Sequence, residues 1–363
     1  MSPHLQSEAR RLANELSSAS ETVRGPLRGY HHETYVMPLP LDGRRSVKFR
    51  EPRSEILWFD RRCFSSEEEL LVALQGWISC VPDVLDVGGV RFQRFIEGRT
   101  IRRGHLVGRR VPDAVFGQIV DLFRQLVRID PHHLGVERRC EREDRAQEGD
   151  CYRFLDRLIT FSEKQVFERN RARFGELFSE LGVGQDSFSR LRKHASGLRE
   201  RPFCLLHADL HRENFIIDGD GRLWAIDWEL AMTGDPLYDL ATHLYLMRYP
   251  EDQSRRMTQE WCEVVERVRP GSSYGWECDL PLILDFKRAQ SVFTDVIRTA
   301  LSLQLETGFN WPALPGAAGK LWGVLAAAAE PLGLDTVPGP SRIMRALERW
   351  QRETRRAYAP VYV

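Results

Sequence analysis

Two aspartates and an asparagine, Asp209, Asn214 and Asp227, stand at the ends of short apolar segments in one stretch of the chain. The turn residues Asp220 and Gly221 lie between two of these segments and predict a β-hairpin. With a two-residue turn at that point, the ladder places Asn214 opposite Asp227, and Asp209 lies in the loop that enters the first strand. Carboxylate and amide oxygens suit a hard divalent cation and an acceptor hydroxyl. This set of residues predicts phosphoryl transfer.

The spacing of these residues also resembles a known family. Residues 207–214 (HADLHREN) resemble the Brenner-type catalytic loop of protein-kinase-like phosphotransferases, and residues 226–229 (IDWE) resemble the metal-binding motif of the aminoglycoside phosphotransferase and choline kinase branch. Residues 234–241 (GDPLYDLA) are similar to a third motif of that branch. The chain is therefore identified as similar to the aminoglycoside phosphotransferase/choline kinase-like family, in its antibiotic phosphotransferase branch. It departs from the pattern at Ala208, where glycine is common, and at Arg212, which adds a cation near the phosphate path.

The resemblance assigns roles to several residues. Asp209 is the catalytic residue that accepts or orients the proton of the attacking hydroxyl. Asn214 and Asp227 hold Mg²⁺ against the triphosphate of ATP, with GTP as the alternative nucleotide. Lys48 contacts the α- and β-phosphates, and Glu69 holds that lysine in place. Glu69 is chosen for its phase with the leucines of its helix, and the alternative is that the acids of residues 67–69 only decorate a helix start.

Four further positions follow from the same resemblance. The carbonyl of Arg94 and the N–H of Ile96 are expected to read the purine edge, in the hinge between two lobes. His211 and Glu229 are candidate substrate contacts. For His211 a packing role is equally open, and for Glu229 a second metal contact or a helix cap is open.

The expected fold is α+β and bilobal, with a protein-kinase-like architecture. Residues 1–97 form a small antiparallel-sheet lobe that binds nucleotide and carries a leading helix within 5–22, and residues 98–363 form a large, mainly helical catalytic and substrate-binding lobe. Strands within 35–39 and 46–50 form a hairpin around Asp42 and Gly43. A helix begins near residue 66, and strands follow at 84–87 and 90–95.

Composition limits the partners. The 52 basic and 52 acidic residues cancel, which gives no overall field to attract nucleic acid or a membrane surface. No signal peptide or membrane-spanning run is recognised. Seven cysteines without CxxC pairs indicate free thiols in a reducing cytoplasm. We therefore expect a cytoplasmic monomer or homodimer whose partner is a small molecule with a hydroxyl group.

The leading hypothesis is a small-molecule O-phosphotransferase that uses ATP and magnesium. Acids and bases nearly cancel from residue 241 onward, and residues 342–356 are basic. Because sites for polycationic aminoglycosides are usually lined with acids, this balance favours a less cationic antibiotic, such as a nucleoside-type or macrolide-type compound, over an aminoglycoside. A metabolic kinase of the choline, homoserine or sugar type is the alternative. A non-catalytic pseudokinase that binds nucleotide is the alternative from another class.

Overall fold

A computed structural model gives the structure of the protein. It describes residues 23–27, 32–38, 46–52, 61–87, 90–101, 109–130, 133–141, 144–305 and 308–357. The leading helix predicted within 5–22 and the turn at Asp42 and Gly43 lie outside the described residues.

The chain forms two compact units. Unit 1 consists of residues 1–58, 62–141 and 203–272, and unit 2 consists of residues 59–61, 142–202 and 273–363. The stretch that carries Asp209, Asn214 and Asp227 therefore belongs to the same unit as the N-terminal strands. The division into lobes at residue 97 stays a prediction.

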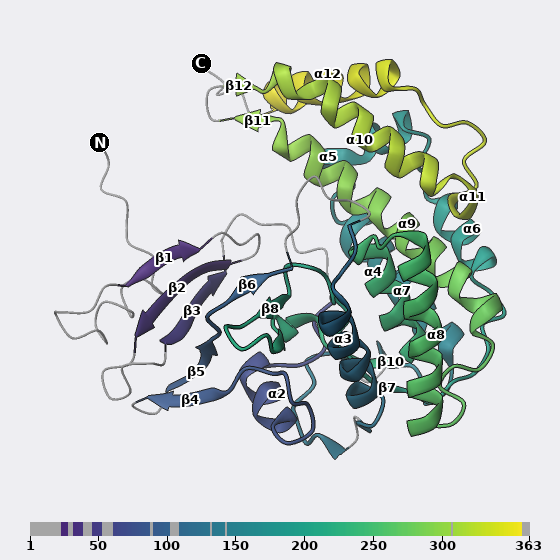
Figure 1. Cartoon of the computed structure of the whole chain (residues 1–363). Coiled ribbons are helices and arrows are strands. Elements are labelled where there is room, and N and C mark those ends of the chain that lie inside the picture. Colours follow the sequence, from purple (N-terminus) through teal and green to yellow (C-terminus); the bar gives the residue numbers. More distant parts are fainter. Residues whose placement is uncertain are drawn as a thin grey trace. The chain divides into compact units, whose positions relative to one another are not determined.

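A five-stranded antiparallel sheet in the order β1-β2-β3-β5-β4 begins unit 1 (Figure 1). Its strands are β1 (Arg24–Leu27), β2 (His32–Pro38), β3 (Ser46–Pro52), β4 (Val84–Val87) and β5 (Val90–Phe95). Tyr35 pairs with Phe49, which confirms the predicted hairpin of β2 and β3. Lys48, in β3, lies opposite Val36 on one side and Gln93 on the other.

One face of this sheet forms a small core of Tyr35, Met37, Val47 and Phe92. Side chains alternate between the two faces of a strand, so Val47 and its neighbour Lys48 point to opposite faces. Val47 is fully buried and Lys48 is half-buried. The core thus fixes which way the Lys48 side chain faces.

Helix α2 (Glu67–Leu74) follows the first three strands. The Ser66 side chain accepts a hydrogen bond from the Glu69 N–H at 3.2 Å, as an N-cap does. Leu70, Leu71 and Leu74 are buried. The predicted helix start, with a serine cap and acids in the first turn, is confirmed.

The rest of unit 1 consists of three helices and short strands. The helices are α3 (Asp113–Leu126), α7 (Pro236–Met247) and α8 (Glu251–Val268). The short strands are β6 (Arg99–Thr100), β7 (Cys204–Leu206), β8 (Phe215–Ile217), β9 (Leu223–Ala225) and β10 (Met232–Gly234). They form a sheet in the order β6-β8-β9 and a pair of β7 with β10.

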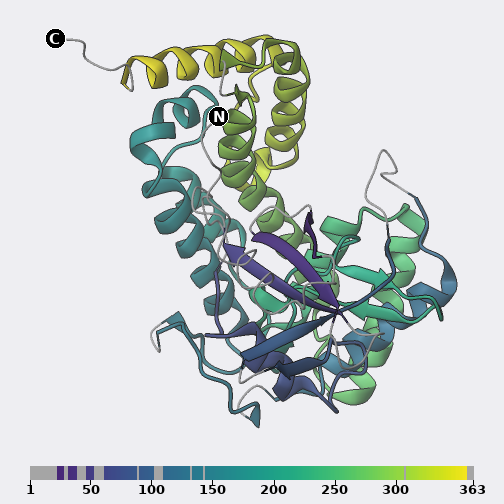
Figure 2. The same ribbon diagram turned by 90° about the vertical axis from the view of Figure 1, so that its left-hand side faces the viewer.

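Unit 2 is mainly helical. Its elements are α4 (Cys151–Phe161), a π-helix (Ser162–Glu168), α5 (Arg171–Glu180), α6 (Asp186–His194), α9 (Trp276–Ser302), β11 (Gln304–Leu305), β12 (Gly308–Phe309), a 3₁₀ turn (Trp311–Ala313), α10 (Leu314–Ala327), α11 (Ala329–Leu332) and α12 (Pro340–Ala357). In Figures 1 and 2, α10 packs against both α9 and α12. The helical character predicted for the C-terminal part is confirmed.

Unit 2 contains a cluster of packed aromatic rings and a buried ion pair. The rings of Phe188 and Phe293 stack with their centroids 4.4 Å apart, and Phe167 meets both at steeper angles. Arg201 is buried and donates to Asp279 at 2.6 Å.

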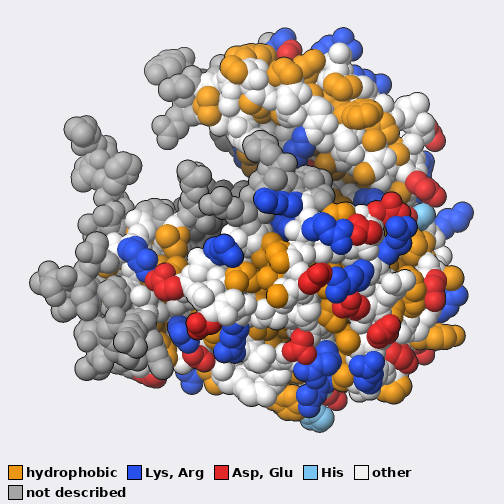
Figure 3. Space-filling view, in the orientation of Figure 1, with side chains coloured by type: hydrophobic (Ala, Val, Ile, Leu, Met, Phe, Trp, Pro, Cys, Tyr) orange, Lys and Arg blue, Asp and Glu red, His pale blue; other side chains and the backbone are white. Residues whose placement is uncertain are grey.

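The surface carries mixed charge. Figure 3 shows basic and acidic side chains interspersed on the face in view, in keeping with the zero formal net charge. Within the described part of the chain, no helix has the length and apolar character needed to cross a membrane. The seven cysteines all lie among described residues, and none of them forms a disulfide bond.

Candidate active site

The loop that carries Asp209 leaves the buried strand β7 and is held by Asp239 from helix α7. The two carboxylate oxygens of Asp239 accept the backbone N–H groups of His207, at 3.0 Å, and Ala208, at 2.7 Å. Asp239 is 2% exposed. Asp235 caps the start of the same helix by accepting the Leu237 N–H at 3.0 Å. Asp235 is therefore the N-cap of α7, and Asp239, from within the helix, braces the loop that carries Asp209.

Ala208 adopts a left-handed conformation, with φ of 65°. This region of φ is costly for a residue with a Cβ, at about 1–2 kcal/mol. The Asp239 carboxylate holds Ala208 there by binding its N–H and that of the preceding residue. The clamp explains how alanine serves at the position where the family pattern has glycine.

Asp209 and Asn214 are brought into direct contact. The Asn214 amide donates to Asp209 Oδ2 at 3.0 Å and to the Asp209 carbonyl at 2.9 Å. His211 Nε2 lies 3.4 Å from the same carboxylate oxygen, and its Nδ1 accepts the Glu213 N–H at 3.1 Å. With Nδ1 accepting, Nε2 carries the proton and faces Asp209. The amide of Asn214 thus orients the carboxylate to which we assign catalysis.

The register of the hairpin β8–β9 differs from the prediction by one residue. Ile216 pairs with Trp224, and the Ile226 N–H donates to the Asn214 carbonyl at 2.9 Å. Asn214 therefore stands opposite Ile226, and Asp227 follows one residue later. Asn214 and Asp227, the two predicted metal ligands, therefore lie at the same end of the hairpin but do not pair with each other across the ladder.

The side chain of Asp218 causes this shift. Its Oδ1 accepts the N–H groups of Asp220, at 3.0 Å, and Arg222, at 2.9 Å. The turn consequently spans three residues and ends at Gly221, whose φ is 79°. Such turns add a residue in the left-handed region, which favours glycine.

Asp227 is itself left-handed, with φ of 68° and ψ of 62°, and it precedes a 3₁₀ turn at Trp228–Leu230. The next residue, Trp228, is 1% exposed and held at two points. Its backbone N–H donates to Glu67 Oε1 at 2.9 Å, and its indole N–H donates to the Ala225 carbonyl at 3.0 Å. Strained backbone of this kind persists where the surroundings fix it, and it gathers at functional sites.

Glu229 forms an ion pair with Arg62, whose Nη2 lies 2.8 Å from Glu229 Oε2. Strand β9 ends at Ala225 and a 3₁₀ turn begins at Trp228, so Asp227 and Glu229 do not lie on one strand face. A substrate or metal contact for Glu229 stays a prediction. Arg62 was not anticipated from the sequence.

The acid of α2 that contacts the segment of Asp227 is Glu67, whereas Glu69 was expected to support the site. Glu69 is exposed, whereas Glu67 reaches the backbone beside Asp227. At about 100° per residue, Glu67 shares the face of Leu70 and Leu74, and Glu69 lies on the opposite face. The phase assigned to Glu69 was therefore wrong, and helical periodicity alone could have selected Glu67. The proposed link between Glu69 and the strand lysine stays a prediction.

Of the two predicted hinge residues, Arg94 lies in β5 and Ile96 directly follows that strand. Arg94 donates its N–H to the Asp83 carbonyl at 2.8 Å, and its guanidinium lies 3.2 Å from the Asp83 carboxylate. Ile96 is buried. At Gly98 the chain passes so close to the Ile217 carbonyl that a Cβ would overlap it, which explains the glycine. Purine recognition by the backbone of Arg94 and Ile96 stays a prediction.

The His207 side chain connects the loop that carries Asp209 to the segment that carries Asp227. Its Nε2 donates to the Ile226 carbonyl at 3.2 Å, and its ring lies 4.5 Å from that of Trp228. Burial lowers the pKa of His207, while the charges of Asp209 and Asp227 oppose that shift. The ring is therefore neutral at pH 7 and structural.

A second buried histidine, His243, is hydrogen-bonded to the same loop. His243 Nδ1 donates to the Leu210 carbonyl at 2.9 Å, and the Tyr249 hydroxyl donates to His243 Nε2 at 3.0 Å. Burial lowers the pKa of His243 to about 3. Arg212 is also buried, and it donates to the Met247 carbonyl at 3.0 Å and to the Arg109 carbonyl at 2.7 Å. The cation expected near the phosphate path is thus committed to backbone carbonyls.

Comparison with known proteins places this site in context. No curated protein sequence matches the chain. Among solved structures, choline kinase LicA from Streptococcus pneumoniae is similar, with a TM-score of 0.54, 15% identity, and coverage of 88% of this chain and 98% of that one. The gentamicin–APH(2")-IIa complex has a TM-score of 0.51 and 15% identity, and the match covers 94% of this chain and 99% of that one. A choline/ethanolamine kinase family protein from Mesorhizobium loti has a TM-score of 0.50 and 16% identity, and the match covers 93% of this chain and 98% of that one.

At these identities the likeness concerns the fold alone, and it confirms the α+β, kinase-like fold predicted from the sequence. The family assignment comes from a different comparison. Residues 63–271, more than half of the chain, match the model of the phosphotransferase enzyme family. The matched region includes the catalytic loop, both strained residues and the α2 acids described above. The chain belongs to the phosphotransferase enzyme family.

Proposed function

We propose that this protein transfers the γ-phosphate of ATP, or of GTP, to a hydroxyl group of a small molecule. The contact between Asn214 and Asp209, beside the left-handed Asp227, is the observation that carries the proposal. In the proposed complex the Asp209 carboxylate would face the acceptor, and the side-chain oxygens of Asn214 and Asp227 would face the phosphates. The family membership supports the same reaction class.

In the proposed reaction the acceptor oxygen attacks the γ-phosphorus as the bond from that phosphorus to the bridging oxygen breaks. The nucleoside diphosphate leaves with the bridging oxygen, and the hydroxyl proton passes to Asp209 and then to solvent. Positioning supplies most of the rate in such transfers. Asn214 contributes by fixing the carboxylate, and His211 Nε2 lies 3.4 Å from the same carboxylate oxygen, Oδ2 of Asp209.

The donor set is compatible with magnesium. Within the described parts of the chain, no three or more His, Cys, Asp or Glu side chains gather as a metal cage. Mg²⁺ is usually held by one or two carboxylates together with substrate phosphates and water. The amide oxygen of Asn214 and the carboxylate of Asp227 would hold the ion, which would neutralise charge on the phosphates. Lys48, half-buried on β3, would contact the α- and β-phosphates from the sheet.

We propose Glu67 as the acid of α2 that supports this site, in addition to the earlier candidate Glu69. Its carboxylate binds the N–H of the residue after Asp227. Arg62 and Glu229 join the same segment by an ion pair. Both contacts hold the segment that presents Asp227.

For the acceptor, we propose an antibiotic that is not strongly cationic, of nucleoside or macrolide type, with an aminoglycoside next in order. Charge balance in the C-terminal part of the sequence supports this order. The proposed location is the cytoplasm, where nucleoside triphosphates are available and where seven free thiols are stable.

A screen of nucleotide consumption tests this proposal. The purified protein is incubated with MgATP or MgGTP and with nucleoside antibiotics, macrolides, aminoglycosides, choline, homoserine or sugars. We expect one class to raise nucleotide consumption and to gain one phosphate by mass spectrometry. Phosphorylation of choline, homoserine or a sugar alone would replace the antibiotic assignment by a metabolic kinase. No transfer to any hydroxyl compound, with nucleotide still bound, would favour a non-catalytic nucleotide-binding protein.

A further inference from the structure

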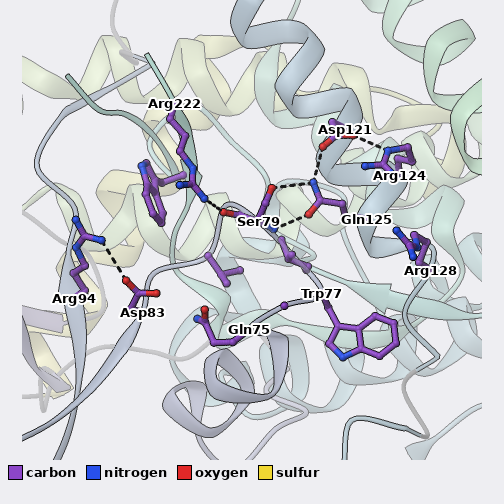
Figure 4. A pocket seen from close by; sticks show the side chains of 14 residues that line it. Gln75, Trp77, Ser79, Asp83, Arg94, Asp121, Arg124, Gln125, Arg128 and Arg222 are labelled. Atoms are coloured by element: carbon purple, nitrogen blue, oxygen red, sulfur yellow. Dashed lines mark hydrogen bonds and ion pairs between the residues drawn. The ribbon is translucent and has the colours of Figure 1, made fainter. Parts of the chain in front are cut away.

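Unit 1 contains an open pocket of about 510 Å³ apart from the residues assigned to phosphoryl transfer (Figure 4). Its lining comes from the segment that follows α2, from β5, from one face of α3 and from β9. The lining residues are Gln75, Gly76, Trp77, Ile78, Ser79, Val81, Asp83, Arg94, Asp121, Arg124, Gln125, Arg128, Arg222 and Trp224. Lys48, Asp209, Asn214 and Asp227 are not among them, whereas Arg94, whose backbone carbonyl is a predicted purine contact, is.

Hydrogen bonds centred on Ser79 shape this pocket, as Figure 4 shows. The Ser79 N–H donates to Gln125 Oε1 at 2.7 Å, and the Gln125 amide donates to Asp121 Oδ2 at 2.6 Å. Arg222, the residue before β9, donates to the Ser79 carbonyl. The segment after α2 is thereby joined to both α3 and β9, so the pocket walls are fixed before any ligand enters.

Arginine dominates the charge of the pocket. Two of its four arginines have carboxylate partners, since Arg94 lies 3.2 Å from Asp83 and Arg124 lies 2.6 Å from Asp121. The other two arginines leave an excess of positive charge in the lining. A pocket that carries such an excess favours an anionic ligand.

Those two arginines are Arg128 and Arg222. Across the described ranges, no carboxylate forms an ion pair with either guanidinium. Arg222 donates to a neutral carbonyl and lies 4.3 Å from the Trp224 ring centroid. Asp218, just outside the lining, accepts the Trp224 indole N–H at 2.8 Å and lies near Arg222, whose charge helps to lower the pKa of Asp218. Arg128 is exposed in the turn that follows α3.

The aromatic part of the site is Trp77. Its side chain lines the pocket and is 50% exposed, which is unusual for the largest apolar side chain. An exposed indole face at a pocket provides a surface on which a planar ring can stack. Figure 4 shows Trp77 and Arg128 at the same end of the pocket in that view.

We propose that this pocket binds a small anion that carries a planar ring, with its phosphate or carboxylate group at Arg128 and its ring at Trp77. Guanidinium groups bind both kinds of anion in a bidentate manner. The volume lies within the range of small-molecule sites, about 300–1,000 Å³, and leaves room for a ring beside the anionic group. The inference does not depend on the proposed function, because Arg128 and Trp77 have no part in it, and Arg94, which also lines the pocket, is predicted to contact the purine only through its backbone carbonyl.

Isothermal titration calorimetry with phenyl phosphate tests the site. Benzoate tests the carboxylate form, and inorganic phosphate and phenol supply the anion and the ring alone. We expect phenyl phosphate or benzoate to bind more tightly than either fragment. Arg128→Gln should weaken that binding at least about tenfold, since it removes a charge-assisted contact. Trp77→Ala should weaken it about three- to tenfold, as loss of ring stacking does.

Two further variants locate the binding. Arg255, exposed on α8 and paired with Glu251 at 2.9 Å, is the matched control, and Arg255→Gln should leave the dissociation constant unchanged. Asp227→Ala should also leave it unchanged. The proposal is overturned if Arg128→Gln binds like the wild type, if inorganic phosphate binds as tightly as phenyl phosphate and benzoate, or if Asp227→Ala abolishes binding.

Discussion

Replacing Asp239 by alanine removes the clamp on the catalytic loop. Asp239 is buried and accepts the backbone N–H groups of His207 and Ala208 at 3.0 and 2.7 Å. A hydrogen bond to a charged acceptor contributes about 1.5–3 kcal/mol, so the two together contribute roughly 3–6 kcal/mol. Release of the left-handed strain at Ala208 returns about 1–2 kcal/mol. The free energy of unfolding should therefore fall by roughly 1–5 kcal/mol, against an ordinary stability of about 5–15 kcal/mol.

The activity should fall more sharply than the stability. Asp209 follows Ala208 directly, and a displacement of about 1 Å at a catalytic group costs on the order of a hundredfold in rate. We expect kcat of Asp239→Ala to fall by about that factor while the protein remains folded in urea titrations. Adding Ala208→Gly should restore part of kcat, because glycine adopts the left-handed conformation without the clamp.

Asp235→Ala is the matched control on the same helix. Asp235 caps α7 by accepting the Leu237 N–H. Its loss should cost about 1–2 kcal/mol of stability and leave kcat near the wild-type value. Wild-type kcat in Asp239→Ala would refute the clamp. An equal loss of kcat in both variants would show that damage to α7 is responsible.

Three other predictions follow from the same site. Asp227→Asn should lose the magnesium dependence of nucleotide binding, measured by calorimetry with and without Mg²⁺, and an unchanged dependence would remove it from the ligand set. Glu67→Gln should lower kcat at least about tenfold, because it weakens a charge-assisted contact beside the proposed metal ligand, whereas Glu69→Gln on the exposed face should not; equal effects would contradict the assignment. His243 has a folded pKa of about 3 against about 6.5 unfolded, so the unfolded chain binds more protons between these values. Its contribution therefore makes the free energy of unfolding fall as pH drops below about 6.5, by at most about 1.4 kcal/mol per pH unit, and His243→Gln should flatten the slope measured by urea unfolding at pH 5 and 7.

Much of the fold was readable from the sequence because local signals agreed with the final structure. Ser66 caps α2 as its type favours, and alternation along β3 sets Val47 against Lys48. The catalytic segment was readable because its residues are fixed by chemistry. These features depend on neighbours that are close in sequence.

The sequence did not predict the features that depend on one side-chain hydrogen bond or on a contact between residues far apart in the chain. The Asp218 side chain added a residue to the hairpin turn and shifted the register, which the Asp-Gly pattern does not reveal. The Arg212 guanidinium donates its hydrogen bonds to carbonyls of residues far along the chain, so its charge alone was misleading. Glu67 was recoverable from helical periodicity, but its partner Trp228 was not.

The most direct test of the central proposal is transfer of labelled γ-phosphate in the wild type and in Asp209→Asn, with the acceptor found by the screen. The variant keeps the shape of the side chain but cannot accept the hydroxyl proton. We expect transfer to fall by at least about a hundredfold, as loss of a general base does, while MgATP affinity stays within about twofold. Transfer at the wild-type rate by Asp209→Asn would contradict the assignment of Asp209 and the mechanism built on it.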